Sequence, residues 1–241
     1  MTKVRRNAVQ ALIDAAATLR DEVDALRFAD PVTHVYNPLT YAWPVHEAYL
    51  RCHDPGRIET VWLGMNPGPW GMAQTGVPFG EVAAVREFWR LDGTIGRPAE
   101  ENPKRPVAGW ECERSEVSGR RLWGLIREQF GDRETAGSTA LVANYCPLVF
   151  MESSGRNRTP DKLPADERAP LDAACDRHLA RVLEIVAPRD VVGVGVYAEK
   201  KLAGVWTGTV NRVLHPSPAS PAANRDWAGT ARGQLVAAGI W

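Results

Sequence analysis

Three polar side chains suited to recognising a heterocyclic base each follow a short apolar run. Asn66 comes after residues 60–63, Asn144 after residues 139–143, and His215 after residues 210–214. A proline-containing loop follows in each case. If the runs are parallel strands of one sheet, their carboxyl ends share an edge, and the three side chains converge there. Any one of them could instead cap a helix or satisfy a turn. The recurrence of the pattern favours a common site.

Two amides and an imidazole make a poor protease or metal site, but they suit a planar heterocycle. An amide presents a donor beside an acceptor, as the edge of a pyrimidine does. We expect Asn144 to accept a hydrogen bond from N3–H of uracil and to donate one to O4. Cytosine presents the reverse pattern, and each polar group left unpaired costs about 1–3 kcal/mol. Phe79 is a candidate to stack on the ring, worth about 1–3 kcal/mol; a core position is an equally good expectation.

Alternating strands and helices are expected to position these side chains. Buried strands are predicted at residues 59–63, 139–143, 190–196 and 210–214. Helices are predicted at residues 4–28, 46–51, 81–89, 120–130, 172–187, 198–203 and 227–238. This order indicates an α/β fold in which helices cover both faces of a parallel sheet. The segment 64–80, rich in glycine and proline, lies where such folds place their sites.

The composition sets limits on the class of protein. The chain has 241 residues, 44% of them hydrophobic and 24% charged, with a formal net charge of zero. We expect a single domain over residues 1–241, with an N-terminal helix within residues 1–30 packed on it. A neutral chain has no general attraction to nucleic acid or membrane, so any contact with a polyanion must come from a local patch. No signal-peptide core or run of about 20 apolar residues is present, which favours an intracellular location: the cytoplasm or nucleoid of a bacterium, or a eukaryotic nucleus.

Short motifs occur in a fixed order over roughly residues 34–239. They include GMNPGP at 64–69, AQTGVPFGE at 73–81, NYCPL at 144–148, SGRN at 154–157 and HPSP at 215–218. Their order and number resemble the single-strand-selective monofunctional uracil-DNA glycosylases. The resemblance implies a three-layer α/β/α uracil-DNA glycosylase-like fold with a central four-stranded, mostly parallel sheet. It also implies a DNA repair enzyme that removes uracil, 5-hydroxymethyluracil or related deaminated or oxidised bases from single- and double-stranded DNA, leaving an abasic site.

The same resemblance assigns roles to individual residues. Asn66 positions the attacking water, and His215 bonds O2 of the base as negative charge builds on it. The substrate-binding residues that it implies are Met65, Gly68, Met72, Phe79 and Asn144. The small Gly68 leaves space beside C5 of the base, which accounts for acceptance of the hydroxymethyl substituent.

The expected chemistry needs no cofactor. Breaking an N-glycosidic bond creates an oxocarbenium-like sugar and an anionic base, and the enzyme must stabilise both charges. The motifs contain no lysine able to form a Schiff base, and the nearest in sequence is Lys104. Simple hydrolysis is therefore expected, without a lyase step. The four cysteines form no C-x-x-C pair, so no metal is expected. The protein is expected to be a monomer.

DNA must be engaged so that the base is exposed. The proline-stiffened loop 215–225 is a candidate wedge between base steps. Better-known relatives carry a larger basic residue at the position of Ala219, so insertion into duplex could be weaker here, or Arg225 could substitute. The expected DNA-binding residues of this loop are Pro216, Ser217, Pro218, Ala219, Ser220, Asn224 and Arg225. The candidates for phosphate contacts are Arg97, Lys104, Arg105, Arg114, Arg120, Arg121, Arg156 and Arg158.

The sequence also allows other interpretations of the function. Residues 193–198 match the G-x-G-x-x-A pattern of dinucleotide sites, but the acidic residue expected about 20 positions later is missing, so nucleotide binding is not expected. A mismatch-type glycosylase of the same fold, preferring hypoxanthine, xanthine or ethenocytosine, stays open. So does a non-catalytic module that binds single-stranded nucleic acid, although the joint presence of Asn66 and His215 argues against it.

Overall fold

A four-stranded parallel sheet forms the centre of the molecule, with the strand order β3-β2-β6-β7. The computed structural model describes residues 3–241. The strands of the sheet are β2 (Thr60–Gly64), β3 (Ala140–Asn144), β6 (Asp190–Val194) and β7 (Val210–Val213). Every residue of β2 is buried, because this strand is central and helices cover both of its faces. The four predicted strands are confirmed to within two residues at each end.

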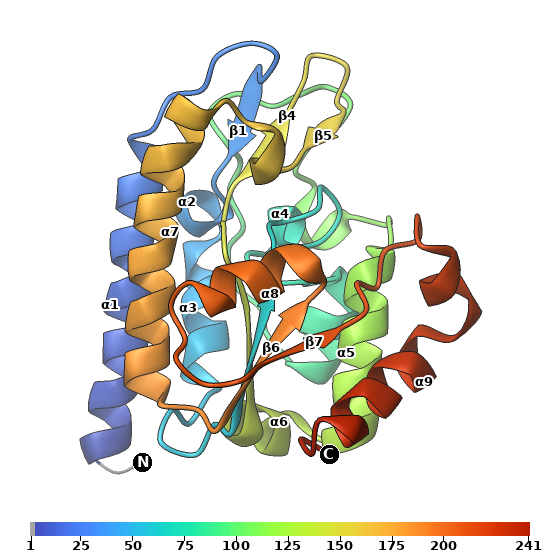
Figure 1. Cartoon of the computed structure of the whole chain (residues 1–241). Helices are drawn as coiled ribbons and strands as arrows, with labels where there is room; N and C mark the ends of the chain where they lie inside the picture. Colours follow the sequence, from blue (N-terminus) through green and yellow to red (C-terminus); the bar gives the residue numbers. More distant parts are fainter. Residues whose placement is uncertain (1–2) are drawn as a thin grey trace.

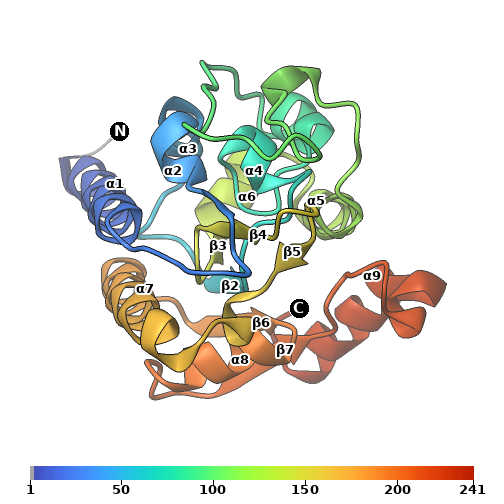
Figure 2. The same cartoon turned by 90° about the horizontal axis from the view of Figure 1, so that it is seen from above.

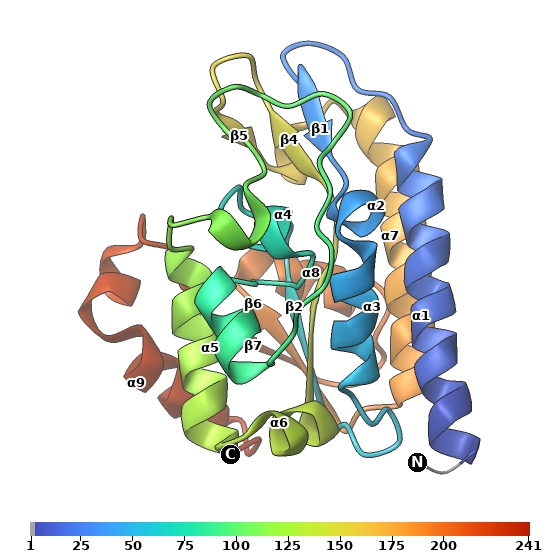
Figure 3. The ribbon, with the colours of Figure 1, turned by 180° about the vertical axis from the view of Figure 1, so that it is seen from behind.

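Helices cover both faces of the sheet, which confirms the three-layer α/β/α prediction. In Figures 1 and 3, α7 and α8 lie on one face, and α3 and α5 lie on the other. Helix α9 packs beside β7 and α5, and α1 packs against α7 and α3. The helices are α1 (Lys3–Asp24), α2 (Pro38–Tyr41), α3 (Trp43–Arg51), α4 (Met72–Thr75), α5 (Val117–Phe130), α6 (Arg133–Thr139), α7 (Ala165–Val186), α8 (Val196–Ala203) and α9 (Pro221–Ala237). Within residues 3–241, no helix is long and apolar enough to cross a membrane.

A second, antiparallel sheet lies beyond the carboxyl ends of the central strands. It has the order β1-β4-β5, from β1 (His34–Tyr36), β4 (Val149–Met151) and β5 (Asn157–Arg158). Figure 2, which views the molecule from above, shows β4 and β5 lying over the central strands. The sequence analysis did not predict this sheet, because its strands are only two or three residues long. Its position places the segment around Asn157 next to the edge where the site was expected.

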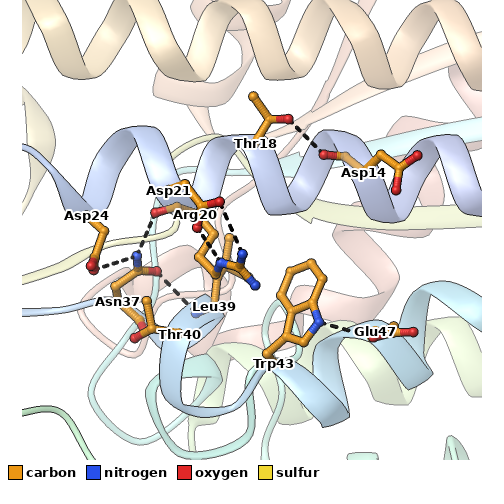
Figure 4. Close-up of polar contacts among 10 residues, drawn as sticks. All are labelled: Asp14, Thr18, Arg20, Asp21, Asp24, Asn37, Leu39, Thr40, Trp43 and Glu47. Atoms are coloured by element: carbon orange, nitrogen blue, oxygen red, sulfur yellow. Dashed lines mark hydrogen bonds and ion pairs between the residues drawn. The ribbon is translucent and has the colours of Figure 1, made fainter.

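The N-terminal helix is shorter than predicted. The apolar spacing predicted residues 4–28, but α1 ends at Asp24. Figure 4 shows the reason: the side chain of Asn37 lies between α1 and the start of α2. Its Nδ2 donates to Arg20 O at 3.1 Å and to Asp24 Oδ1 at 3.2 Å, and its Oδ1 caps α2 by accepting from Leu39 N at 3.2 Å. The chain then turns so that Phe28 packs edge-on against the ring of Phe150, 4.9 Å between centroids.

Three further helix predictions need correction. The segment predicted as a helix at 81–89 contains a π-helical turn, Ala84–Phe88. Helix α7 begins at Ala165 rather than 172, and it includes Pro170 in its second turn. Helix α9 begins at Pro221 rather than 227, with Ser220 as its N-cap and a kink at Asp226. Two short 3-10 turns, Gly109–Glu111 and Pro160–Lys162, complete the described elements.

Candidate active site

The three predicted residues meet at one edge of the sheet. In the parallel register, Gly64 of β2 pairs with Asn144 of β3, and Val194 of β6 pairs with Val213 of β7. Asn66 and His215 each follow two residues after these strand ends. They line, together with Asn144, a single pocket of about 250 Å³. The prediction that they converge is therefore confirmed.

The pocket contains most of the residues that the sequence singled out, and several that it did not. Of the predicted residues, it is lined by Met65, Asn66, Gly68, Met72, Phe79, Asn144, His215 and Ser217. The lining residues missed by the sequence analysis are Pro67, Gly71, Glu116, Ser118, Asn157 and Thr159. The motif that contains Asn157 was noted, but no local signal shows that β5, or the residue before α5, reaches this pocket. No lysine lines this pocket, so the lining offers no side-chain amine that could form a Schiff base.

Asn66 presents one end of its amide to the pocket. The Nδ2 atom donates to Leu148 O at 3.1 Å and more weakly to Pro67 O at 3.4 Å. These bonds fasten the amide nitrogen to the chain segment that follows β3. The carbonyl Oδ1 takes no part in them and is the atom left to accept a hydrogen bond from a molecule in the pocket.

Asn144 and Phe79 can both approach residue 64 closely because it is a glycine. A Cβ at Gly64 would lie 2.5 Å from Asn144 Oδ1 and would overlap the ring of Phe79. Asn144 is only 8% exposed, and its Nδ2 contacts Met72 Sδ at 3.4 Å. Sulfur is a weak acceptor, so this amide nitrogen still has hydrogen-bonding capacity for a ligand.

Phe79 adopts a backbone conformation that is uncommon for a bulky residue. Its φ is +54°, in the left-handed region. Its carbonyl oxygen accepts from Glu81 N within the same loop at 2.9 Å, and it lies against Gly119 of α5, where a Cβ would overlap it. Such conformations persist where the surrounding structure enforces them, often at binding sites. The partly buried ring lines the pocket.

His215 is placed by a glycine of the apparent dinucleotide motif. Gly195 has φ of +89°, and a Cβ there would lie 3.1 Å from Cβ of His215. Gly193 has a similar role, since a Cβ there would lie 2.5 Å from the backbone nitrogen of Glu199 in α8. Burial lowers the pKa of His215. The imidazole is therefore neutral near pH 7 and can donate one ring N–H to a ligand.

A buried glutamine supports the loop that follows β2. Gln74 Nε2 donates to Pro69 O and Pro106 O, at 2.9 and 3.0 Å. Its Oε1 accepts from Ala108 N and Gly109 N, at 2.8 and 3.1 Å. All four hydrogen-bonding positions of the amide are thus used to join the loop to a distant segment. The sequence analysis gave Gln74 no role.

The predicted wedge is an ordered loop with an exposed tip. Arg121 Nη1 donates to Pro216 O at 3.0 Å and its Nη2 to Asn224 Oδ1 at 2.9 Å, while Asn224 Nδ2 donates to Pro218 O at 2.8 Å. Ser217 lines the pocket and Ser220 caps α9. At the tip, the exposed residues are Pro218, Ala219, Asn224 and Arg225, whereas Pro216 is buried. Asn224 and Arg121 are thus committed to bracing the loop.

A cationic aromatic cluster lies beside the pocket. The ring of Trp70 has Arg114 at 4.5 Å and Arg105 at 5.3 Å from its centroid. Both arginines were predicted phosphate contacts. Arg97 and Arg158 pair with carboxylates, Glu101 at 3.5 Å and Glu152 at 3.2 Å. Among residues 3–241, no group of three or more His, Cys, Asp or Glu is arranged to hold a metal ion.

Comparison with known proteins agrees with this geometry. A model of the uracil DNA glycosylase superfamily matches residues 53–232. Single-strand selective monofunctional uracil-DNA glycosylases of Rattus norvegicus and Bos taurus are each 44% identical to the chain, over 100% and 98% of it and 88% of their own length. A crystal structure of SMUG2 from Pedobacter heparinus superposes with a TM-score of 0.65 at 17% identity, covering 94% of this chain and 99% of that one. At that identity, the likeness concerns the fold alone. The chain belongs to the uracil DNA glycosylase superfamily and, within it, to the family of single-strand selective monofunctional uracil-DNA glycosylases.

Proposed function

We propose that the protein is a DNA repair enzyme that hydrolyses the N-glycosidic bond of uracil in DNA. The observation that carries the proposal is the convergence of Asn66, Asn144, His215 and Phe79 on one pocket of about 250 Å³. Asn144 supplies an amide for the edge of the base, and Phe79 supplies an aromatic face. His215 supplies a donor for the developing oxyanion, and Asn66 an acceptor for a water. The 44% identity to glycosylases named for this activity supports the same conclusion.

The uracil base enters the pocket from DNA in an unstacked, flipped conformation. Its ring stacks on Phe79. Asn144 Oδ1 accepts from N3–H, and Asn144 Nδ2 donates to O4. Cytosine reverses both of these hydrogen-bonding groups and is rejected, because the amide is almost completely buried and both of its groups would then face a group of their own kind.

Bond cleavage leaves the electron pair of the N1–C1′ bond on the base. The negative charge spreads to O2, where the neutral His215 imidazole donates a hydrogen bond. A water oxygen, positioned by Asn66 Oδ1, bonds to C1′ of the oxocarbenium-like sugar and then releases a proton to solvent. The products are the free base and an abasic site. Since the pocket lining offers no lysine, the DNA strand stays intact.

The proposal extends to finer points of substrate and partner. We infer that 5-hydroxymethyluracil is also excised, that single- and double-stranded DNA both serve as substrate, and that the protein acts as a monomer. The exposed tip of the braced loop follows the pocket-lining Ser217, and Trp70, beside two arginines, comes between the pocket-lining Gly68 and Gly71 in the chain. Both features support DNA contact.

The test is cleavage of labelled single- and double-stranded oligonucleotides that carry one uracil, with and without alkali treatment. Strand breaks only after alkali are the expected result. Breaks without alkali would mean a lyase or nuclease activity. Absence of product, with activity on hypoxanthine, xanthine or ethenocytosine instead, would favour the mismatch-type alternative. Tight binding of DNA without any abasic product would favour a non-catalytic module.

A further inference from the structure

A glutamate that the proposed reaction does not use forms part of the pocket wall. Glu116 precedes α5, and its side chain lies over two glycines of the loop after β2. A Cβ at Gly68 would overlap Oε2 of Glu116, and a Cβ at Gly71 would lie 3.0 Å from its Cγ. Neither glycine has a positive φ. The glutamate approaches both glycines closely, and the space above Gly68 is occupied by its carboxylate.

The position of this carboxylate relative to the base follows from the Asn144 amide. This step rests on the proposed function, in which Asn144 Nδ2 donates to O4 of uracil. Nδ2 lies against Met72 Sδ at 3.4 Å, so O4 lies on the Met72 side of the pocket. C5 is the ring atom next to C4. Gly71 directly precedes Met72, and Glu116 lies against both Gly71 and Gly68, so this part of the lining adjoins Met72. The carboxylate is therefore on the side of the ring that carries the C5 substituent.

The carboxylate of Glu116 is held by backbone N–H groups and has no cationic partner among residues 3–241. Burial raises the pKa of Glu116, and the neighbouring Glu81 acts in the same direction, while the backbone N–H groups of Ser118 and Trp70 act against them. Within residues 3–241, no lysine or arginine forms an ion pair with it. A partly buried carboxylate without a cation gains from any hydroxyl that reaches it, and loses hydration to any methyl group that covers it.

We propose that Glu116 determines which C5 substituents the pocket accepts. Its carboxylate accepts a hydrogen bond from the hydroxyl of 5-hydroxymethyluracil. The methyl group of thymine offers no donor and would cover the carboxylate, so the normal DNA base is rejected. A hydrogen bond to a charged acceptor corresponds to a discrimination of roughly 10- to 100-fold. Glu116 is thus a specificity-determining residue for the proposed reaction. It acts on the substituent at C5, whereas Asn144 acts on N3 and O4.

The first test uses the unmodified protein and substituents of similar size. Single-stranded oligonucleotides carry uracil, 5-hydroxymethyluracil, 5-ethyluracil or thymine, and each kcat/KM is divided by the value for uracil. We expect 5-hydroxymethyluracil to exceed 5-ethyluracil by at least tenfold, because only the hydroxyl can donate. Equal excision of these two bases would overturn the proposal, since the wall would then sense size alone. Failure to excise uracil would instead defeat the proposed function.

The second test removes the acceptor while preserving the volume of the side chain. In Glu116→Met, the ratio of 5-hydroxymethyluracil to 5-ethyluracil excision should fall at least tenfold, and in Glu116→Gln it should fall less, because a neutral oxygen remains. Ratios are taken within each variant, so a general loss of activity does not affect them. Glu113→Gln, an exposed glutamate nearby, is the control and should keep the wild-type ratio. An unchanged ratio in Glu116→Met would overturn the proposal.

Discussion

The two loops that meet at the pocket hold their residues by different means. The loop after β2 is held by close packing: residues 71–78 are all buried, and Glu116 lies against Gly68 and Gly71. At Gly64, the last residue of β2, a Cβ would overlap Phe79 and Asn144. The loop after β7 is held by hydrogen bonds from outside it, chiefly from Arg121 and Asn224, and its tip is exposed. Added atoms should therefore disrupt the structure of the first loop, and removal of hydrogen-bond donors should disrupt that of the second.

The largest effect is expected where the second loop begins, at the residue proposed to stabilise the leaving base. His215→Ala should lower kcat roughly 100- to 1000-fold, since one donor to a developing oxyanion is worth about 2.7–4 kcal/mol. Single-turnover excision of uracil measures the effect, and KM should change little. His34→Ala in β1, far from the pocket lining, is the control. A near-normal kcat in His215→Ala would remove this residue from the mechanism.

A methyl group added at Gly64, where β2 ends and the first loop begins, is expected to have the next largest effect. Gly64→Ala places a methyl group into the Phe79 ring and Asn144 Oδ1, and overpacking of this kind costs about 1–3 kcal/mol of unfolding free energy. Excision of uracil should fall at least about tenfold. The matched glycine is Gly233 in α9, where a Cβ would meet nothing within 4 Å. Gly233→Ala should keep full activity and gain up to about 1 kcal/mol; equal behaviour of the two variants would contradict the packing argument.

Low pH should reduce the stability of the folded protein through His46, which contacts the first loop at Gly76. Burial lowers the pKa of His46 to about 4, and its Nδ1 lies 2.8 Å from Gly76 O. Since the unfolded chain binds this proton at about pH 6.5, the folded protein loses stability as the pH falls from about 6.5 to about 4 and no further below that. The loss attributable to His46 is on the order of 3 kcal/mol. Urea unfolding at several pH values measures it, and His46→Gln should show a shallower decline; parallel curves would contradict this assignment.

Removal of a donor from the second loop is expected to have the smallest effect. Arg121→Ala removes the donor to the carbonyl of Pro216, whereas the carbonyl of Ser217 still accepts from Ser220 N. Because one such hydrogen bond contributes about 0.5–1.5 kcal/mol, KM for uracil in duplex DNA should rise roughly 2- to 10-fold. Arg120→Ala removes the same charge from the neighbouring position, where the side chain is exposed and bonds only Ser115 Oγ. An equal rise in both variants would indicate phosphate attraction rather than loop bracing.

The fold and the centre of the site could be predicted because their signals are local. The runs that became β2, β3 and β7 each end at a polar residue, and parallel pairing alone brings Asn66, Asn144 and His215 together. Glu116 could not be placed in this way, because its position depends on how α5 packs over the loop. The sequence analysis interpreted Gly68 as open space beside the base, whereas a carboxylate occupies the space above it. The wedge was predicted by position, but the bracing by Arg121 depends on a contact across about 100 residues of sequence.

Phe79 has a thermodynamic consequence for base capture. Its left-handed backbone is unfavourable for a phenylalanine, and its carbonyl oxygen lies against Gly119 of α5. The ring is consequently fixed before any DNA arrives, and the entropy of ordering it is lost during folding rather than during binding. Preorganisation of this kind raises the affinity for a flipped base at the expense of the stability of the empty protein. A residue that favours this backbone conformation at position 79 would give a more stable protein, but one with a lower affinity for the flipped base.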